Sequence, residues 1–132
     1  MTLDDLLARK AMMPEPRVVC LIGSTRFSDA YREANLRETL EGRIVLTIGC
    51  DTKSDEMLHL TLEDKVALDL LHLFKIDSAR EVLVLNVNGY VGESTRREIA
   101  YARRRGKVLR WLEPPNEPAP EERPIGGYYG DE

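Results

Sequence analysis

Two short polar segments, each directly after an apolar run, carry residues that could bind an anion. The runs are 18–22 and 82–87, and the segments are Gly23-Ser24-Thr25-Arg26 and Gly92-Glu93-Ser94-Thr95-Arg96-Arg97-Glu98. Glycine gives a flexible backbone, hydroxyl groups donate hydrogen bonds, and a guanidinium fork matches phosphate oxygens. A plain strand-to-helix connection favours the same glycine and serine, so each segment alone is a weak signal. Together the two segments predict a phosphate-binding pocket with a carboxylate beside it.

Glu98, at the end of the second segment, fits two interpretations. With Thr95 as the N-cap of a helix, Glu98 stands three residues later, where its carboxylate accepts a hydrogen bond from the Thr95 backbone N–H. Beside a phosphate site, the carboxylate would instead face the anomeric carbon of a sugar, as nucleophile or as stabiliser of a cationic transition state. The spacing by itself favours the first interpretation. Ser94 and Thr95 likewise are either caps or further hydroxyl donors to the pocket.

Further candidates lie on a predicted helix before the second apolar run. His72 and Lys75 are adjacent on that helix, and Asp77 is turned partly aside. In the functional interpretation, His72 or Asp77 orients Glu98 or protonates a leaving base. In the structural one, His72 satisfies a neighbouring carbonyl and Lys75 is solvated. Three tyrosines could stack on a nucleobase or pack in the core: Tyr31, Tyr90 and Tyr101.

Alternating strand and helix patterns would position these residues. Strands are predicted at 17–22, 43–48, 82–87 and 107–112. Helices are predicted at 3–13, from Ser28 as N-cap to Gly42, at 62–78, and from Thr95 to Gly106. This order implies right-handed crossovers and an α/β fold, a three-layer doubly wound parallel sheet of four to five strands, Rossmann-like or flavodoxin-like. Both polar segments then lie at the carboxyl edge of the sheet, where such folds bind ligands.

The helix at 62–78 is expected to belong to the core. Its apolar residues form two adjacent rows, which are Val66-Leu70-Leu73 and Ala67-Leu71-Phe74. The stretch 49–60 is expected to be a loop over the ligand, with Asp51 and Asp55 as further candidate proton donors. The chain divides into a helical extension at 1–16, docked on the domain, a single domain at 17–113, and a tail at 114–132. That tail holds five of the seven prolines and is expected to be extended or flexible.

Composition limits the possible partners. A chain of 132 residues with 42% hydrophobic content suits one domain, and a net charge of −4 argues against a duplex nucleic acid partner. No apolar stretch approaches the ~20 residues that span a membrane, and the acidic start is unlike a signal peptide. Cys20 and Cys50 have no paired spacing, and no Cys/His cluster could hold zinc. We expect a reduced, cytoplasmic protein with no metal and no cofactor.

These segments resemble the nucleoside 2-deoxyribosyltransferase-like superfamily, which includes nucleoside 5′-monophosphate N-glycosidases. The resemblance covers roughly 17–113, and its most specific part is the Glu-Ile-x-Tyr-Ala helix at 98–102 after a Gly-rich turn. Its other carriers are the strand and turn at 18–26, the segment Lys75-Ile76-Asp77-Ser78-Ala79, and Gly106-Lys107. The chain also looks like a group of short bacterial and phage proteins that share the Gly-Tyr-x-Gly-Glu-Ser-Thr stretch found here at 89–95.

The resemblance implies an enzyme that cleaves an N-glycosidic bond of a nucleoside or nucleoside 5′-monophosphate, by hydrolysis or transfer. It places the family's catalytic glutamate on Glu98 and its phosphate-binding turn on 23–26. The transferases carry an aspartate where His72 stands, so either Asp69 or Asp77 takes its place, or the chemistry differs or is absent. The resemblance also implies a homodimer or larger assembly whose sites are completed by a neighbouring chain. The alternatives are a non-catalytic nucleotide-sensing module and an enzyme that cleaves NAD or a related nucleotide.

Overall fold

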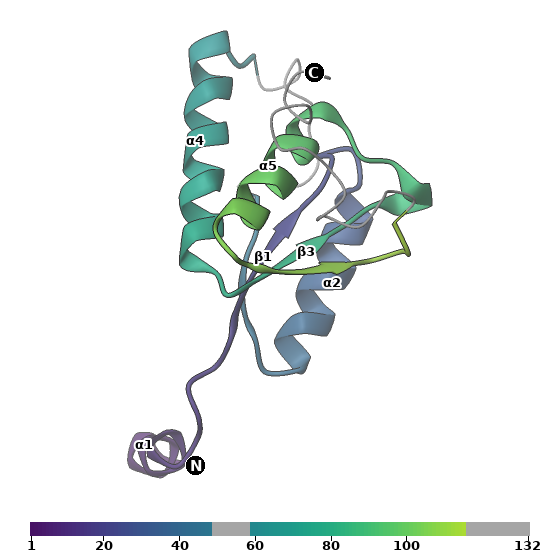
Figure 1. Cartoon of the computed structure of the whole chain (residues 1–132). Coiled ribbons are helices and arrows are strands. Elements are labelled where there is room, and N and C mark those ends of the chain that lie inside the picture. Colours follow the sequence, from purple (N-terminus) through teal and green to yellow (C-terminus); the bar gives the residue numbers. More distant parts are fainter. Residues whose placement is uncertain (49–58, 116–132) are drawn as a thin grey trace.

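The computed structural model describes residues 1–48 and 59–115, and within them four parallel strands form one sheet (Figure 1). The strands are β1 (Val18–Ile22), β2 (Ile44–Leu46), β3 (Glu81–Val84) and β4 (Val108–Trp111), in the order β2-β1-β3-β4. β2 pairs with one edge of β1, β3 pairs with the other edge of β1, and β4 pairs with the far edge of β3. The strand order therefore reverses between β1 and β3, which is where a doubly wound sheet opens a crevice.

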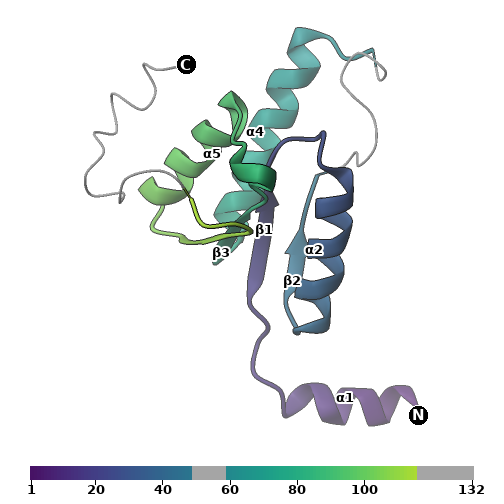
Figure 2. The same ribbon diagram turned by 90° about the vertical axis from the view of Figure 1, so that its right-hand side faces the viewer.

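Helices cover both faces of this sheet (Figure 2). α2 (Ser28–Leu40) packs on one face, and α4 (Leu62–Ser78) and α5 (Glu93–Arg104) pack on the other. The three-layer, Rossmann-like α/β fold predicted from the sequence is confirmed, with four strands in the described part of the chain. None of the described helices is long and apolar enough to cross a membrane.

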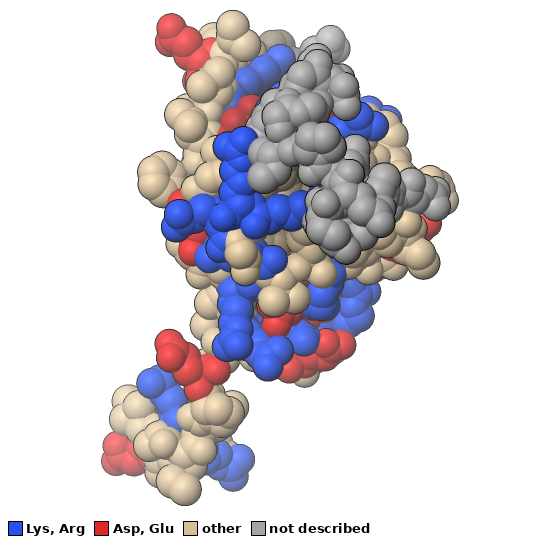
Figure 3. Space-filling view, viewed as in Figure 1, with Lys and Arg blue, Asp and Glu red and all other residues tan. Residues whose placement is uncertain are grey.

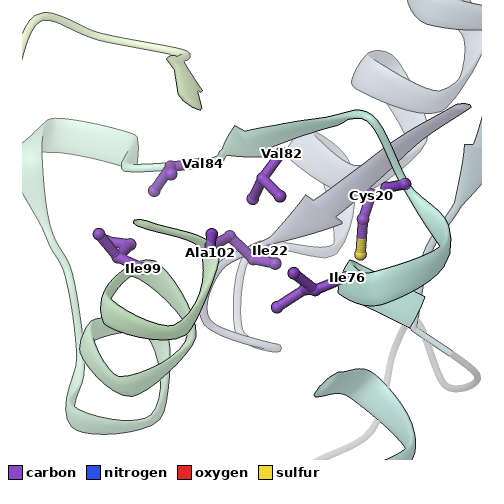
Figure 4. Packing of buried hydrophobic residues seen from close by; sticks show 8 residues of the cluster. Cys20, Ile22, Ile76, Val82, Val84, Ile99 and Ala102 are labelled. Atoms are coloured by element: carbon purple, nitrogen blue, oxygen red, sulfur yellow. The ribbon is translucent and has the colours of Figure 1, made fainter. Parts of the chain in front are cut away.

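The core consists of two layers because side chains of a strand alternate between its faces. Cys20 and Ile22 of β1 point toward α4 and α5, whereas Val19 and Leu21 point toward α2. Figure 4 shows the first layer, in which the two β1 residues meet Val82 and Val84 of β3 and residues of both helices: Ile76, Ile99 and Ala102. β1 and β3 are buried on both faces, which explains why their sequences are apolar apart from Glu81, the first residue of β3.

The first and fourth predicted strands are close to the observed ones, but the third ends at Val84 instead of residue 87 and the second is also shorter than expected. It ends at Leu46 instead of residue 48. The predicted N-cap of α2 is wrong: Phe27 occupies that position, no described side chain caps it, and Ser28 is the first helical residue. Gly42 does follow the end of α2, with φ +89°, a left-handed conformation that glycine adopts at little cost.

The N-terminal helix α1 (Leu3–Ala11) begins with a capping box but is not docked. The Thr2 side chain accepts a hydrogen bond from the Asp5 backbone, and the Asp5 carboxylate accepts one from the Thr2 backbone. No residue of α1 is buried by the described part of the chain, and the helix lies apart from the sheet in both ribbon views (Figures 1 and 2). The prediction of a docked helix is therefore wrong for a single copy of the chain.

α4 has the predicted bounds but buries a different side. Its buried residues are His72 and Ile76, whereas Val66, Leu70 and Phe74 of the predicted stripe are about half exposed or more. Figure 1 shows the first turns of α4 reaching beyond the sheet, so no strand lies beneath them. The apolar pattern predicted the helix correctly, but the interpretation of the whole stripe as core was wrong.

Charged side chains form two further clusters, one around buried glutamates and one on the surface. At the opposite end of the sheet from the polar turns, Glu81 accepts hydrogen bonds from Arg17 Nη1 (3.2 Å) and Arg110 Nε (2.9 Å), and Glu38 pairs with Arg110. Basic side chains also gather over α5 and around its C-terminal end (Figure 3). These come from the segment 96–107, whose last helical turn carries Arg103 and Arg104 near the negative end of the helix dipole.

Candidate functional site

A cavity of about 570 Å³ opens at the carboxyl edge of β1 and β3. Both predicted polar segments border it, because the paired ends of the two strands, Ile22 and Val84, lie side by side. The first segment contributes Gly23, Ser24 and Thr25. The second contributes the start of α5, and α4 forms a third wall. The juxtaposition of the two turns, expected from the sequence, is therefore present in the fold.

The turn after β1 is held by a close backbone contact. Gly23 has φ +153°, and a Cβ atom there would lie 3.1 Å from both Cβ and the carbonyl oxygen of Leu85. The Tyr31 hydroxyl, on α2, donates a hydrogen bond to the Gly23 carbonyl at 2.8 Å. The backbone conformation favours glycine here, a Cβ would require Leu85 to shift, and the neighbouring Ser24 and Thr25 line the cavity.

Arg26 lies at the rim of the site. Its Nε donates to Ser24 Oγ at 3.1 Å and its Nη2 to the Tyr90 hydroxyl at 3.3 Å. The guanidinium carbon is 4.4 Å from the centre of the Tyr90 ring, a cation–π arrangement. Tyr90 lines the cavity, whereas Arg26 is not among the described residues that do. Arg26 thus supports the turn and adds positive charge close to the mouth.

The start of α5 differs from the prediction in a way that matters for Glu98. The N-cap is Gly92, so Thr95 is the third helical residue and is buried, and Glu98 lies a further turn along. Glu98 is therefore not the capping partner of Thr95, and that interpretation is wrong. Backbone N–H groups of the first turn of α5 lack helical partners, and the residues that carry them border the cavity: Gly92, Glu93, Ser94 and Thr95.

The Glu98 side chain is 14% exposed and lines the cavity. Its Oε2 lies 3.6 Å from Nε2 of His72, which is also at the wall. Burial raises the pKa of Glu98 to about 8, the Asp69 carboxylate adds to this increase, and Arg97 opposes it. The carboxyl group of Glu98 is therefore mostly protonated at neutral pH.

His72 has the opposite shift. Burial lowers its pKa to about 4, the Lys75 ammonium group lowers it further, and a backbone hydrogen bond with Leu21 opposes both effects. The Cys20 sulfur lies 3.9 Å from the same Nε2 atom. His72 is therefore neutral at physiological pH and stands between a thiol and a carboxyl group.

Two predicted residues lie elsewhere. Asp77 is outside the described lining of the cavity, where its carboxylate accepts hydrogen bonds from the Tyr101 hydroxyl (2.8 and 3.0 Å) and pairs with Arg105 (3.1 Å). This cluster joins the C-terminal ends of α4 and α5. The suggested roles of Asp77 in proton transfer and of Tyr101 in base stacking have no support from this placement. Asp51 and Asp55 lie outside the described residues.

Sequence reasoning missed several members of the site. Lys65, Leu68 and Leu71 line the cavity and were not named as site residues, whereas Asp69, which also lines it, was named as a possible replacement for the aspartate of the transferases. Asp69, Leu68 and Lys65 come from the same side of α4 as His72, at spacings of three, four and seven residues along the helix, and Leu71 is the residue next to His72 in the chain. Helical spacing from His72 would have identified most of them. The site therefore combines phosphate-type donors, carboxyl groups, lysines and an apolar wall.

No protein-family model matches this chain, and no curated protein is significantly similar to it in sequence.

Proposed function

We propose that the protein cleaves the N-glycosidic bond of a nucleoside or nucleoside 5′-monophosphate, as a hydrolase or a deoxyribosyltransferase. The observation that carries this proposal is the position of Glu98 in one cavity with two turns of the type that binds phosphate. The resemblance to the nucleoside 2-deoxyribosyltransferase-like superfamily supports it on the same residues. A cavity of about 570 Å³ is within the range of small-molecule sites, ~300–1,000 Å³.

The 5′-phosphate would be held between the two turns. Ser24 and Thr25 offer hydroxyl groups from one side, and the backbone N–H groups that open α5 point to the same space from the other. Arg26, at the rim, adds a positive charge. A phosphate held there would position the sugar next to Glu98, one helical turn into α5.

The sugar carbon C1′ would then face the Glu98 carboxyl group. As the C1′–N bond breaks, positive charge builds on the sugar ring, and a positioned carboxylate stabilises this charge better than mobile water does. In one course, Glu98 forms a glycosyl ester that water or a second base then opens. In the other, it guides a water molecule to C1′.

The departing base would lie along the α4 wall. Leu68 and Leu71 offer apolar surface, the Tyr90 ring offers a stacking face, and the Asp69 carboxyl group is within the same lining. Asp69 can exchange a proton with the base, which is a role that Asp77 is too far from the cavity to perform.

A nucleotide-sensing module is the second candidate, and the raised pKa of Glu98 favours it. A protonated carboxyl group is a weak nucleophile, but it is a good hydrogen-bond donor to a bound ligand. In a sensor, the same turns bind the phosphate and no bond is broken.

Chromatography separates these functions. Nucleosides, their 5′-monophosphates and NAD are incubated with the wild type, Glu98→Gln and the matched control Glu33→Gln, an exposed glutamate on α2. Free base should appear with the wild type and the control and fall by a factor of about 10³ or more with Glu98→Gln. Binding without any base release would favour the sensor, and release from NAD alone would identify the larger substrate. A second free base added to the reaction distinguishes transfer from hydrolysis.

We also propose a homodimer built on α4. Its exposed row of Leu62, Val66, Leu70 and Phe74 follows four-residue spacing, so two antiparallel copies can interlock around Leu70. The same helix lines the cavity, so a second copy would lie close to the site.

A further inference from the structure

Two titratable side chains from different elements meet at the wall of the cavity. His72, from α4, is 9% exposed at its side chain, and Glu98, from α5, is 14% exposed. The distance of 3.6 Å from Nε2 to Oε2 is longer than a hydrogen bond, and a small rotation of either side chain would close it. α4 and α5 both pack on the face of the sheet that carries Cys20 and Ile22, which keeps the two groups together.

The surroundings of His72 determine which of its nitrogens can accept a proton. Nε2 faces two groups, the Glu98 carboxyl at 3.6 Å and the Cys20 thiol at 3.9 Å. Burial keeps the proton on both, since it raises the pKa of Cys20 to about 12 and that of Glu98 to about 8. The Cys20 thiol has the Leu21 carbonyl as an acceptor at 3.8 Å, so the Glu98 carboxyl group is the donor that Nε2 can accept from, and the ring proton then belongs on Nδ1.

Charges around His72 and Glu98 favour the form in which both side chains are neutral. Lys75, on the same helix as His72, disfavours an imidazolium, and Asp69 disfavours a carboxylate at Glu98. Arg97 acts in the opposite direction on Glu98, and the Tyr31 hydroxyl on α2 is kept protonated by burial and by Glu98. Two buried neutral groups also cost less than a separated buried charge.

We propose that His72 and Glu98 share a single proton, which rests on the Glu98 carboxyl group and passes to Nε2 of His72 when a positively charged centre forms in the cavity. In this step the O–H bond of Glu98 breaks, an N–H bond forms on His72, and the charge of the pair stays zero. The step gives the site a carboxylate only when a cation is there to use it. The catalytic consequence of this proton transfer rests on the proposed function. The sharing of a proton by His72 and Glu98 does not depend on that function.

His72 is thus a positioning residue that sets the charge of Glu98, and the pH dependence of base release reports this role. In the wild type the pair carries its own proton acceptor, so the rate should change by less than threefold between pH 5 and 7. In His72→Gln, Glu98 can ionise only by losing its proton to water, so the rate should rise about tenfold per pH unit in the same range. Equal slopes for the two proteins would overturn the proposal.

NMR of the imidazole nitrogens tests the pair without any substrate. The chain has only two histidines, so His59→Gln leaves His72 as the single source of these signals. We expect Nδ1 to carry the proton at pH 6, and the Nε2 signal to shift with a midpoint near pH 8, where Glu98 loses its proton. In His59→Gln/Glu98→Gln that step should vanish. A proton on Nε2, or the same step in both proteins, would overturn the proposal.

The two readouts separate this proposal from the proposed function. A midpoint near pH 8 that depends on Glu98, in a protein that releases no base, supports the shared proton and removes the enzyme. If the protein releases base but the Nε2 signal of His72 is the same with and without Glu98, the result supports the enzyme and overturns the shared proton.

Discussion

The burial of the Glu98 side chain determines much of the chemistry that the site can perform. A carboxyl group at a helix start usually serves the backbone, but here the N-cap lies at Gly92 and Glu98 is turned to the cavity. It meets His72 instead of a backbone N–H. The chemistry of the site therefore depends on the desolvation of this one group.

Stability as a function of pH should report this desolvation. The folded-state pKa of Glu98 is raised from 4.5 to about 8, so its ionisation opposes folding. The stability contributed by the protonated Glu98 side chain is fully present below about pH 4.5 and is lost as the pH rises through about 8. Between pH 5 and pH 9 the wild type should lose roughly 2–4 kcal/mol relative to Glu98→Gln, measured as free energy of unfolding in urea. A parallel pH dependence in the two proteins would contradict the burial of this carboxyl group.

Gly23 supports the turn after β1 through two separate effects, and substitutions can separate them. Gly23→Ala places a Cβ 3.1 Å from Leu85 at a φ of +153°, whereas Gly42→Ala meets only an unfavourable φ of +89° with no described atom within 4 Å. We expect Gly42→Ala to cost about 1 kcal/mol and Gly23→Ala about 2–4 kcal/mol of unfolding free energy. Similar costs in urea unfolding would show that the contact with Leu85 does not matter.

At the scale of the element, α4 links the sheet, the cavity and an exposed apolar face. His72 and Ile76 anchor it to the core, while Leu68, Asp69 and Leu71 border the cavity. The row around Leu70 points away from both. An apolar row this long on an isolated monomer favours association.

A charged residue in the middle of that row should prevent the homodimer. Leu70 is 53% exposed, so Leu70→Glu should be accepted by the monomer fold. At micromolar concentrations, light scattering after size-exclusion chromatography should show a dimer for the wild type and a 15 kDa monomer for Leu70→Glu. Leu36→Glu, at an exposed leucine of α2, is the matched control and should stay dimeric. A monomeric wild type, or a dimeric Leu70→Glu, would exclude this interface.

At the scale of the whole molecule, buried glutamates at the two ends of the sheet have pKa shifts in opposite directions. At the carboxyl edge the pKa of Glu98 is raised, whereas at the other end Glu81 is buried among arginines and its pKa is lowered. Burial by itself raises the pKa of Glu81, but hydrogen bonds from Arg17 and Arg110 and the charge of Arg43 lower it below its ordinary value. Through Arg110, which also pairs with Glu38, this cluster joins α2 to β3 and β4.

The Glu81 cluster should make the protein sensitive to acid. Because its folded-state pKa is lowered, Glu81 contributes stability above its ordinary pKa of 4.5, and this is lost as the pH falls through the lowered folded value. Glu81→Gln should lower the unfolding free energy at pH 7 by about 1–3 kcal/mol and lose less further stability in acid. Glu33→Gln, at an exposed position, should behave as the wild type in thermal unfolding at pH 7 and pH 3.5. Equal acid sensitivity of Glu81→Gln and the wild type would place the sensitive groups elsewhere.

The sequence by itself determined the order of the elements, the parallel sheet and the meeting of two polar turns at its carboxyl edge. These features follow from local patterns: continuous apolar runs for strands buried on both faces, and glycine-rich turns after them. The bounds of α4 followed in the same way, because Thr61 and Asp64 form a complete capping box.

Only the tertiary structure decided the role of Glu98 and the buried side of α4. Thr95 and Gly92 are both acceptable N-caps in the sequence, and the choice of Gly92 removed Glu98 from the cap. Likewise, the apolar rows of α4 are wider than the surface that the sheet offers, so packing selected His72 and Ile76 and left Leu70 outside. Caps and helix faces are decided by what lies opposite them in space, which spacing along one element does not contain.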